Sequence, residues 1–352
     1  MDTGSGTAQI REPRRRRKMQ RVTMMDVAKL AQVSPSTVSL YLRKPEAVSP
    51  AAGQEIARAI GALGYVPNLV AGGLAAASSR VVSIIVPSIR NAFFAETVST
   101  LQSELAAEGL QVLLGHSEYG EAQEEALVRT ALSWAPAAIV LTGLSHSPGT
   151  RKLLEASGVP VVEMWELGGE PLDMAVGFNH PQVGASAARH LLSKGRRNLA
   201  FLGARMQEDH RAAQRASGFE EACGAGGATA CEVINHLGAA TVEAGTLLLN
   251  RALQQIPDLD GIACSNDLIA LGVLFECQRQ GIAIPGQVAV IGFGDLDFSA
   301  SCIPSLTTIR PSGDLIGKEV ARLILSSIQG ARVEGAQRII DTHHVLIERR
   351  ST

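Results

Sequence analysis

The chain has 352 residues, of which 46% are hydrophobic, 4% aromatic and 19% charged, and its formal net charge is −2. This composition suits a globular protein of roughly two to three domains and excludes a chain dominated by disorder. The N-terminus is basic and polar, and no stretch approaches about 18 consecutive apolar residues, so neither a signal peptide nor a membrane span is indicated. We therefore expect a cytoplasmic protein that does not associate with membranes.

The cysteines also limit the possible functions. There are five, an odd number, and no two of them form a C-x-x-C pair. This pattern favours buried thiols over a disulfide framework or a zinc site. We expect no metal and no cofactor.

Charge is distributed unevenly along the chain. Residues 1–80 hold 12 Lys or Arg against 5 Asp or Glu, whereas residues 81–352 hold 20 against 29. Much of the N-terminal excess is the run Arg14–Lys18, within a segment, 1–21, that we expect to be a basic disordered tail. A basic head on an acidic body favours a polyanionic partner at one end of the protein.

The segment that follows the tail predicts two short helices. Thr23 is a side-chain cap for a first helix, roughly Met24–Ala31, in which Val27, Ala28 and Leu30 are expected to face inward. Ser34 and then Pro35 begin a second helix.

That second helix runs roughly to Tyr41, with Val38 buried and small hydroxyl side chains facing outward near its N-terminal end. Two such helices indicate a helix-turn-helix, whose second helix enters the major groove of DNA. An ordinary αα-hairpin is the alternative.

A third helix, Pro50–Leu63, is expected between its cap Ser49 and the terminating Gly64. It completes a predicted DNA-binding domain over 22–67. The next segment, 68–80, is rich in small residues and includes two adjacent glycines, so we expect a hinge that stays disordered until a partner orders it.

From residue 81 the pattern alternates between buried strands and amphipathic helices. The predicted fold is α/β: the three-helix head, the hinge, and a two-lobed body of two parallel sheets. The lobes are predicted at about 81–174 and 175–302, with the C-terminal segment, up to 352, crossing back. A ligand is expected in the cleft between them, at the carboxyl ends of the strands.

Four segments carry a family resemblance: DVAKLAQVSPSTVS in the head, LGYVPN before the hinge, CSND after a strand, and IGFGD with IPSLTTIRP near the C-terminus. Together they resemble the lactose-repressor (LacI/GalR) family of bacterial transcription regulators over residues 22–345. Within that family the body is most similar to gluconate-utilisation repressors, through segments such as FLGAR and FECQRQGIAIP. The resemblance implies a homodimer that binds double-stranded operator DNA and a small effector in the cleft of each body.

By this resemblance Pro35, Ser36 and Leu40 are base-reading positions, Thr37 lies near the DNA backbone, and Leu74 is a minor-groove wedge. Most relatives have an arginine at the position of Leu40, so the usual family operator is not expected here. The candidate DNA-binding residues are Thr23, Pro35, Ser36, Thr37, Ser39, Leu40, Asn68 and Leu74.

The resemblance also implies an effector site at strand ends and at the starts of the following helices. Arg215 falls on the family's effector-anchoring arginine, and a guanidinium fork matches a carboxylate. The family's polyol-binding aspartate aligns with Gly294, so Asp295 or Asp297 is expected to replace it. The candidate effector-binding residues are Ser88, Phe93, Phe94, His116, Glu163, Trp165, Arg211, Arg215, Asn266, Asp267, Asp295 and Asp297.

Several of these residues also fit structural roles. Phe93 and Phe94 could belong to the core, Asp267 could cap a helix, and Arg211 could be a surface cation.

The leading hypothesis is a repressor of sugar-acid (gluconate or 2-ketogluconate) utilisation genes that its effector releases from DNA. Alternatives are a regulator for another carbohydrate and one that binds DNA only with its ligand. A sugar-binding protein or an enzyme on the same body is a further alternative. The sequence contains no G-x-S-x-G, P-loop or H-E-x-x-H, and no G-x-G-x-x-G after a strand, so we expect no catalytic activity.

Overall fold

The chain divides into two compact units, Met1–Ala75 and Ala76–Thr352, and each has a hydrophobic core of its own. The computed structural model describes residues 22–66, 79–89, 93–330 and 335–352. The predictions for the tail, for Asn68 and Leu74, and for most of the hinge lie outside these residues, as does the side chain of Phe93.

The described part of the first unit consists of α1 (Met24–Leu30), α2 (Pro35–Arg43), the short 3-10 helix η1 (Pro45–Ala47) and α3 (Pro50–Leu63). Each α-helix begins at a hydroxyl cap: the side chains of Thr23, Ser34 and Ser49 each accept a hydrogen bond from a backbone N–H three residues on. Gly64, with φ +60°, ends α3 in the left-handed conformation that glycine adopts without strain.

The core of the first unit joins all three helices. Its buried members are Val27, Ala28, Ala31, Val38, Ile56 and Ala59. The prediction that Leu30 faces inward is wrong, because its side chain is 41% exposed. The buried stripe of α1 passes through Val27, Ala28 and Ala31, and Leu30 lies about 100° around the helix from its middle.

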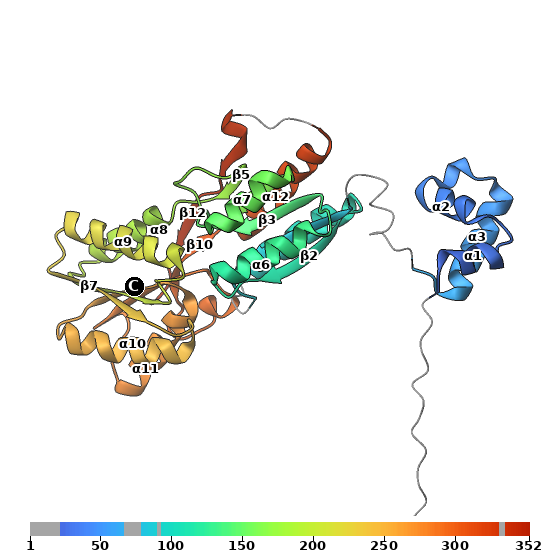
Figure 1. Ribbon diagram of the computed structural model, residues 1–352. Coiled ribbons are helices and arrows are strands. Elements are labelled where there is room, and N and C mark those ends of the chain that lie inside the picture. The colour runs from blue at the N-terminus through green and yellow to red at the C-terminus, as the bar shows by residue number, and fades with distance from the viewer. Residues whose placement is uncertain (1–21, 67–78, 90–92, 331–334) are drawn as a thin grey trace, which may run out of the picture. The chain divides into compact units, whose positions relative to one another are not determined.

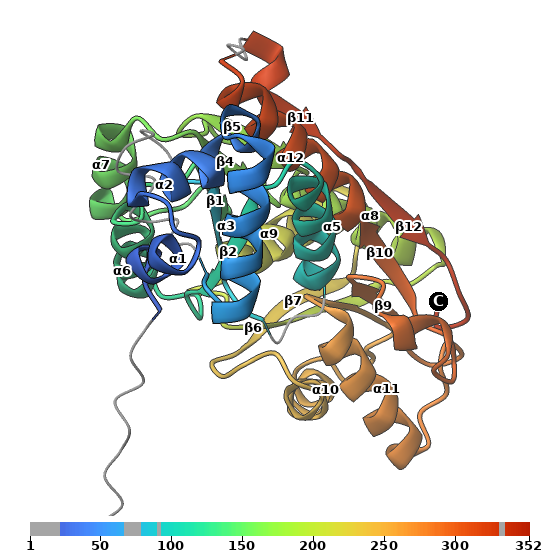
Figure 2. The same cartoon turned by 90° about the vertical axis from the view of Figure 1, so that its right-hand side faces the viewer.

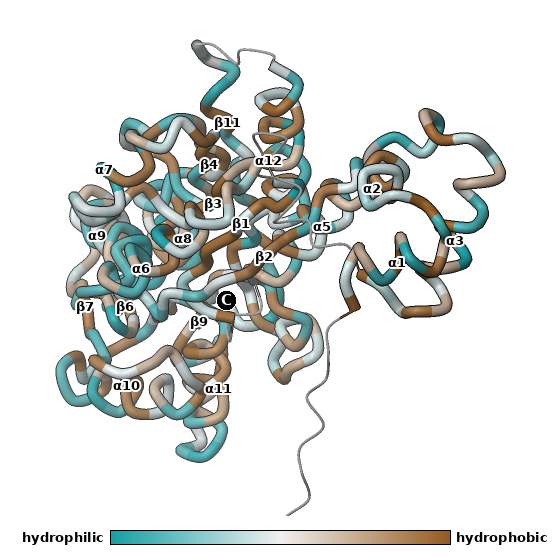
Figure 3. The backbone as a smooth tube through the Cα atoms, turned by 45° about the vertical axis from the view of Figure 1, so that its right-hand side comes forward, coloured by the Kyte–Doolittle hydropathy of each residue, from teal (hydrophilic) through white to brown (hydrophobic). Residues whose placement is uncertain are grey.

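The second unit contains two six-stranded sheets, in the strand orders β11-β5-β4-β3-β1-β2 and β12-β10-β9-β8-β6-β7. All strand pairs are parallel except β10 with β12. Figure 1 shows the arrangement, and Figure 3 shows the hydrophobic colour of the central strands. The strands are β1 (Val81–Val86), β2 (Gln111–His116), β3 (Ala138–Thr142), β4 (Val161–Met164), β5 (Met174–Gly177), β6 (Asn198–Ala204), β7 (Ala230–His236), β8 (Gly261–Cys264), β9 (Ala289–Phe293), β10 (Thr307–Pro311), β11 (Ile339–Asp341) and β12 (His344–Ile347).

Helices cover both faces of each sheet, because the buried strands are apolar on both faces. On the first sheet α5 and α12 pack side by side on one face (Figure 2), and α6 and α7 cover the other. On the second sheet α8 and α9 cover one face, and α10 and α11 the other. These helices are α5 (Phe93–Ala107), α6 (Glu121–Leu132), α7 (Pro148–Ser157), α8 (His180–Ser193), α9 (His210–Ala225), α10 (Val242–Gln255), α11 (Asp267–Gln280) and α12 (Gly313–Ile328).

Each sheet with its helices forms one lobe, and the chain passes between the lobes three times: after β5, after β10 and after β11. The predicted α/β fold with two sheets is confirmed. The predicted lobe boundary at 174/175 is wrong, because Ala175 lies inside β5 and pairs with Glu163 of the first sheet. The predicted end at 302 also stops short of β10, which pairs with β9 in the second sheet.

Among the helices that the structure describes, none is both long and apolar enough to cross a bilayer.

Candidate functional site

The N-terminal turn of α2 carries small polar side chains. Pro35 and Ser36 are exposed, and Thr37 is half-buried. Ser34 Oγ lies 2.6 Å from Ser36 Oγ and 2.7 Å from Thr37 Oγ1, so the three hydroxyls form one hydrogen-bonded group. Val38 is fully buried and fixes the rotation of the helix. The exposed end of α2 therefore has the size and polarity to enter a major groove.

The other described candidates of the first unit lie around this turn. Ser39 and Leu40 are half-buried on α2. The Thr23 hydroxyl donates to Asp26 Oδ2 at 2.7 Å, and the Thr23 backbone N–H donates to the same oxygen at 2.8 Å. Thr23 therefore completes a capping box, and its hydroxyl group donates its hydrogen bond within the first turn of α1.

In the second unit, a cavity of about 360 Å³ lies between the two lobes at the carboxyl ends of the strands. The first lobe contributes Ser88, after β1, and Glu118 and Tyr119, after β2. The second lobe contributes Ala204, Arg205, Asp209, Arg215, Ala239, Ala240, Thr241, Val242, Ser265, Asn266 and Leu268. Open α/β sheets bind ligands at this edge, and the volume suits a small molecule.

A narrow neighbouring cavity of about 10 Å³ has an aromatic wall and shares three residues with the first. Phe94 and Trp165 meet edge to face with ring centroids 5.0 Å apart, and the indole N–H donates to Thr97 Oγ1 at 3.2 Å. The lining residues are Phe94, Tyr119, Trp165, His180, Asp209, Arg211, Arg215 and Phe293.

Arg215 lies on both cavities and is 5% exposed. Its Nη1 donates to His180 Nδ1 at 2.9 Å and its Nη2 to the Ser265 carbonyl at 3.0 Å, while the guanidinium carbon lies 4.2 Å from the centre of the Phe293 ring. Among the described residues, its Nε–H has no hydrogen-bond partner. Burial lowers the pKa of Arg215 to about 10, so the side chain stays charged at neutral pH.

His180 fixes one side of this guanidinium. Burial, and then the charge of Arg215, hold the pKa of His180 well below its usual value, so the imidazole is neutral. Its Nε2–H donates to the Trp165 carbonyl at 2.8 Å, which leaves Nδ1 free to accept from Arg215. Within the described residues, the buried cation therefore has two neutral hydrogen-bond partners and no bound carboxylate.

The position of α9 depends on close contact with α8. A Cβ on Gly184 would lie 1.8 Å from the Arg215 carbonyl oxygen, and one on Gly218 would lie 2.0 Å from the Pro181 carbonyl oxygen. Only glycine permits this approach, which brings the Arg215 side chain to the lobe boundary.

Two further side chains of α9 bind the first lobe directly. Arg211 Nη1 donates to the Thr142 carbonyl at 3.2 Å, and Gln214 Nε2 donates to Glu166 Oε1 at 2.6 Å. A Cβ at Gly143, where φ is +93°, would lie 2.5 Å from Arg211 Nη1. One helix of the second lobe thus provides both cavity residues and contacts between the lobes.

The structure brings together part of the predicted effector set. Asn266 caps α11, with Oδ1 accepting from the Ile269 N–H at 3.0 Å, and also lines the larger cavity. The predicted residues that line one or both cavities are Ser88, Phe94, Trp165, Arg211, Arg215 and Asn266.

His116 and Glu163 do not line either cavity. His116 is exposed at the end of β2. Glu163 is fully buried within the first lobe, where Oε1 lies 3.1 Å from His146 Nε2 and Oε2 accepts from the Leu172 N–H at 2.5 Å. Its carboxylate is therefore bound inside the lobe, which corrects the prediction that it contacts effector.

The three candidate aspartates also lie off the cavities. Asp267 is buried, and its carboxylate accepts from the Thr308 and Ser299 hydroxyls at 2.7 and 2.8 Å and from the Leu296 N–H at 2.9 Å. Asp295 binds Arg310 and Arg349, and Asp297 is exposed. Asp267 and Asp295 hold the loops around β10, and the cap of α11 is Asn266 and not Asp267. The replacement of the family's polyol-binding aspartate by Asp295 or Asp297 stays a prediction.

His146 gives the first lobe a pH-dependent stability. Burial alone would lower the pKa of His146, but hydrogen bonds to and charges of Glu124 and Glu163 raise it to about 9. Because this folded-state pKa lies above the unfolded value of 6.5, the stabilisation is complete below about pH 6.5 and is lost as pH rises through 9. The loss should be on the order of 3 kcal/mol.

Between pH 6.5 and 9.5 the free energy of unfolding of the wild type should fall with pH. We therefore expect it to fall less in His146→Gln. Urea unfolding across this range measures it. The exposed His116→Gln is the matched control and should keep the wild-type slope. Equal slopes for wild type and His146→Gln would contradict the assignment.

Sequence reasoning missed several cavity residues. Glu118 and Tyr119 have φ of +50° and +65°, and Arg205 has φ of +51°, conformations that residues other than glycine rarely adopt. The residue types at these three positions do not predict a left-handed backbone. Arg205 and Asp209, however, lie one and five residues after the end of β6 and could have been found by the same strand-end rule that selected Ser88.

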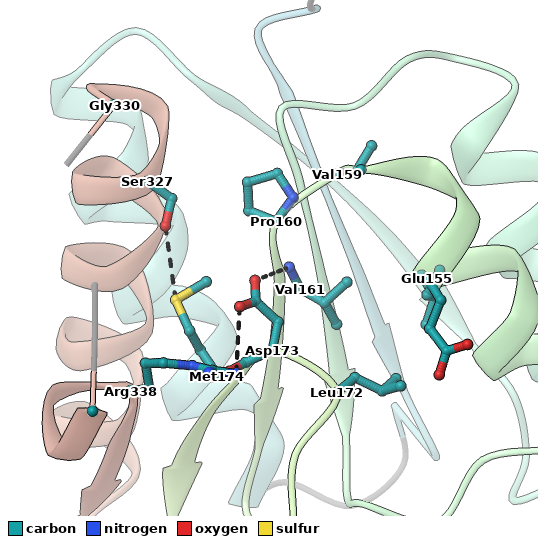
Figure 4. A pocket seen from close by; sticks show the side chains of 13 residues that line it. Glu155, Val159, Pro160, Val161, Leu172, Asp173, Met174, Ser327, Gly330 and Arg338 are labelled. Carbon is teal, nitrogen blue, oxygen red and sulfur yellow. Dashed lines mark hydrogen bonds and ion pairs between the residues drawn. The ribbon is translucent and has the colours of Figure 1, made fainter. Parts of the chain in front are cut away.

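A larger cavity, of about 940 Å³, lies at the amino ends of β4 and β5, at the opposite edge of the first sheet (Figure 4). Two of its charged residues are paired, since Asp173 accepts from the Val161 N–H at 3.2 Å and lies 3.8 Å from Arg338, whereas Glu155 is exposed. Among the described residues that line it, no buried cation comparable with Arg215 is present.

A helix-turn-helix and a two-lobed body with a cavity between the lobes define a ligand-responsive, DNA-binding regulator. Residues 23–68 match bacterial regulatory proteins of the lacI family, and residues 188–352 match the periplasmic binding protein-like domain. The chain is 36% identical to the HTH-type transcriptional regulator GntR of Pseudomonas aeruginosa, over 94% of this chain and 96% of that protein. It belongs to the LacI family.

Solved structures agree with this assignment. A LacI-family transcriptional regulator from Silicibacter pomeroyi is 33% identical and superimposes with a TM-score of 0.88, over 94% of this chain and 99% of that one. The transcription regulator GntR from Chromobacterium violaceum is 36% identical, with a TM-score of 0.72, over 77% of this chain and 98% of that one.

Proposed function

We propose that the protein represses genes of sugar-acid utilisation by binding operator DNA as a homodimer, and that a sugar acid such as gluconate or 2-ketogluconate releases it. The observation that carries the sugar-acid assignment is Arg215, a buried cation with an unpaired Nε–H among the described residues, in the cavity between the lobes. A carboxylate would satisfy this group and neutralise its charge. The relatives named GntR and IdnR support the class of regulator.

Polar groups around Arg215 suit the hydroxyls of a polyol chain. Ser88 and Thr241 offer hydroxyls, Asn266 an amide, and Asp209 a carboxylate. Few large apolar side chains of the kind that line a lipid or drug site are present in the 360 Å³ cavity between the lobes. The combination of one buried cation with several hydroxyl and carbonyl partners favours a hydroxylated acid over a neutral or apolar ligand.

Exposed apolar side chains on the second lobe support the homodimer. Leu247 of α10 is 53% exposed and Phe275 of α11 is 44% exposed, and Leu237 and Ile303 on nearby loops are more exposed still. Large apolar side chains grouped on a surface favour protein association. Two copies would present two helix-turn-helix heads to the half-sites of one operator.

Coupling between ligand and DNA requires that the two arrangements of the lobes differ in ligand affinity. In the structure Arg211 and Gln214 bind the first lobe from the same helix that carries Arg215. A ligand that binds Arg215 and the first-lobe residues Ser88 and Tyr119 would change the balance of these contacts. Coupling of about 1–3 kcal/mol, or roughly 5–150-fold in operator affinity, is the usual range.

Calorimetric titration of the full chain tests the ligand class. We expect gluconate or 2-ketogluconate to bind and to release labelled operator DNA in an anisotropy assay. Sorbitol, which keeps the hydroxyl chain but lacks the carboxylate, is the matched control and should bind at least about tenfold more weakly. Sorbitol binding as tight as that of gluconate would exclude the proposed role of Arg215.

Leu40 tests how the second helix reads DNA. Leu40→Arg should shift the preference at one position of each half-site towards guanine by about 1–3 kcal/mol, because arginine can make two hydrogen bonds to the guanine edge. Selection from a randomised operator library measures the preference, with the exposed Arg58→Gln on α3 as a control outside the proposed reading helix. An unchanged preference would show that residue 40 does not face the bases.

A further inference from the structure

Arg205 is a second cation in the 360 Å³ cavity between the lobes, and its side chain makes no hydrogen bond or ion pair with the described residues. It directly follows β6 and lines the cavity together with Arg215. In the part of the chain that the structure describes, its guanidinium makes no hydrogen bond and no ion pair. Arginine carries five N–H donors in a rigid fork, so a half-buried one without partners is able to bind an anion.

The backbone of Arg205, by contrast, is held tightly. Its N–H donates to the His236 carbonyl at 2.8 Å, and its carbonyl accepts from the N–H groups of Glu208 at 2.9 Å and Asp209 at 2.6 Å. The residue is fixed at φ +51°. Such a conformation costs on the order of 1 kcal/mol or more for a residue with a side chain and is kept where the surroundings enforce it, often at ligand sites.

The carboxylates around the cavity do not neutralise the positive charges of Arg205 and Arg215. Asp209 lies 3.6 Å from Arg211 and accepts from the Ala212 N–H at 3.3 Å, so its charge is already paired. The Glu118 side chain is 70% exposed, and its charge is largely screened by water. Two cations therefore face a cavity in which no carboxylate of the described residues binds either of them.

Arg205 and Arg215 both lie near the phenol of Tyr119. Burial, and then the charge of Asp209, raise the pKa of its phenol, and the charges of Arg211, Arg215 and Arg205 act in the opposite direction. The phenol thus lies within electrostatic range of both cavity arginines. The two guanidiniums nonetheless arise from separate places, because Arg205 precedes α9 whereas Arg215 is in its second turn, about 8 Å along the helix axis from its first residue.

We propose that Arg205 is the specificity-determining residue for a second anionic group, so that the effector is a sugar acid with two anionic groups, one bound by Arg215 and the other by Arg205. This inference rests on the proposed sugar-acid function and narrows it. A sugar acid phosphorylated at its far end and a sugar diacid share this chemistry. A ligand with one carboxylate would leave one of the two cations unpaired in a partly desolvated cavity.

Calorimetry on the full-length protein tests the proposal with three probes that share a six-carbon hydroxylated chain. Gluconate carries one anionic group, glucarate two carboxylates, and 6-phosphogluconate a carboxylate and a phosphate. We expect the wild type to bind at least one of the two doubly anionic probes about tenfold or more tightly than gluconate. The probe that shows the preference identifies the second group as phosphate or carboxylate.

Variants at Arg205 assign the preference to this residue. Arg205→Gln should reduce the ratio of doubly to singly anionic affinity to within about twofold, while Arg205→Lys, which keeps the charge but loses the fork, should retain an intermediate ratio. Arg189→Gln removes an exposed arginine from α8 of the same lobe and should keep the wild-type ratio. Thermal unfolding of each variant confirms that it is folded.

The outcomes separate the two proposals. A wild-type protein that binds gluconate at least as tightly as both doubly anionic probes would overturn the role of Arg205 and leave the sugar-acid function standing. A preference that persists in Arg205→Gln would also overturn it, as would an equal loss of affinity for all three probes. Failure of all three probes, and of 2-ketogluconate, to bind the wild type would remove the sugar-acid function itself.

Discussion

Replacing Arg215 with glutamine is expected to give a protein that binds operator DNA normally but is no longer released by a sugar acid. Glutamine retains a polar group near His180 and the Ser265 carbonyl, but it removes the charge that would bind the carboxylate. Truncating one partner of a buried charge pair costs about 2–5 kcal/mol, which corresponds to a loss of ligand affinity of roughly 30-fold to several thousand-fold.

Operator release measured by anisotropy, together with calorimetric titration of gluconate and 2-ketogluconate, checks this result. Arg189→Gln, on the surface of the same lobe, is the matched control and should be released at wild-type concentrations. Operator affinity without ligand should be unchanged in Arg215→Gln, because the first unit has its own core. Release of Arg215→Gln at wild-type ligand concentrations would show that another group, such as Arg211, anchors the effector.

The head could be predicted almost to the residue because its signals are local. Each α-helix begins at a hydroxyl cap that is one residue before the first helical position, and α3 has the predicted bounds Pro50–Leu63. The error at Leu30 arose because a seven-residue helix offers too few apolar positions to define the angle of its buried stripe. In such a short helix tertiary packing decides which side is buried.

The body could be predicted as far as its alternating order, but not in its crossings between lobes. β5 has four residues and β11 three, and strands this short show no distinctive periodicity. Pairing between β5 and β11 joins residues 164 positions apart, such as Ala175 and Ile339, which no local pattern reveals. The lobe boundary was therefore placed inside β5.

The candidate site could be located by the strand-end rule, but the rule does not distinguish a side chain that faces the cavity from one that faces the protein. Asp267 and Glu163 both stand at or near strand ends, yet their carboxylates bind hydroxyl, imidazole and backbone groups within their own lobes. These contacts depend on tertiary structure. Tyr119 and Arg205 line the cavity with left-handed backbone that the sequence does not reveal, although Arg205 directly follows β6 and so satisfies the strand-end rule.

Deleting residues 1–67 is expected to abolish specific DNA binding while leaving a folded body that still binds its ligand. The cores are independent: the buried residues of the first unit all lie between Val27 and Ala59, and the clusters of the second unit contain none of them. Both lobes and both cavities lie entirely within the second unit. The truncated chain therefore keeps every buried residue of its own hydrophobic clusters.

Electrostatics predict the same result for DNA. Residues 1–67 hold 11 Lys or Arg against 5 Asp or Glu, whereas residues 68–352 hold 21 against 29, so the truncated protein is acidic overall and repels phosphates. Anisotropy with an operator selected by the full-length protein measures the loss, and calorimetry with the sugar acid serves as the control for folding. If the truncated protein kept specific operator binding, the DNA-reading surface would have to lie in the body, and the proposed role of α2 would be wrong.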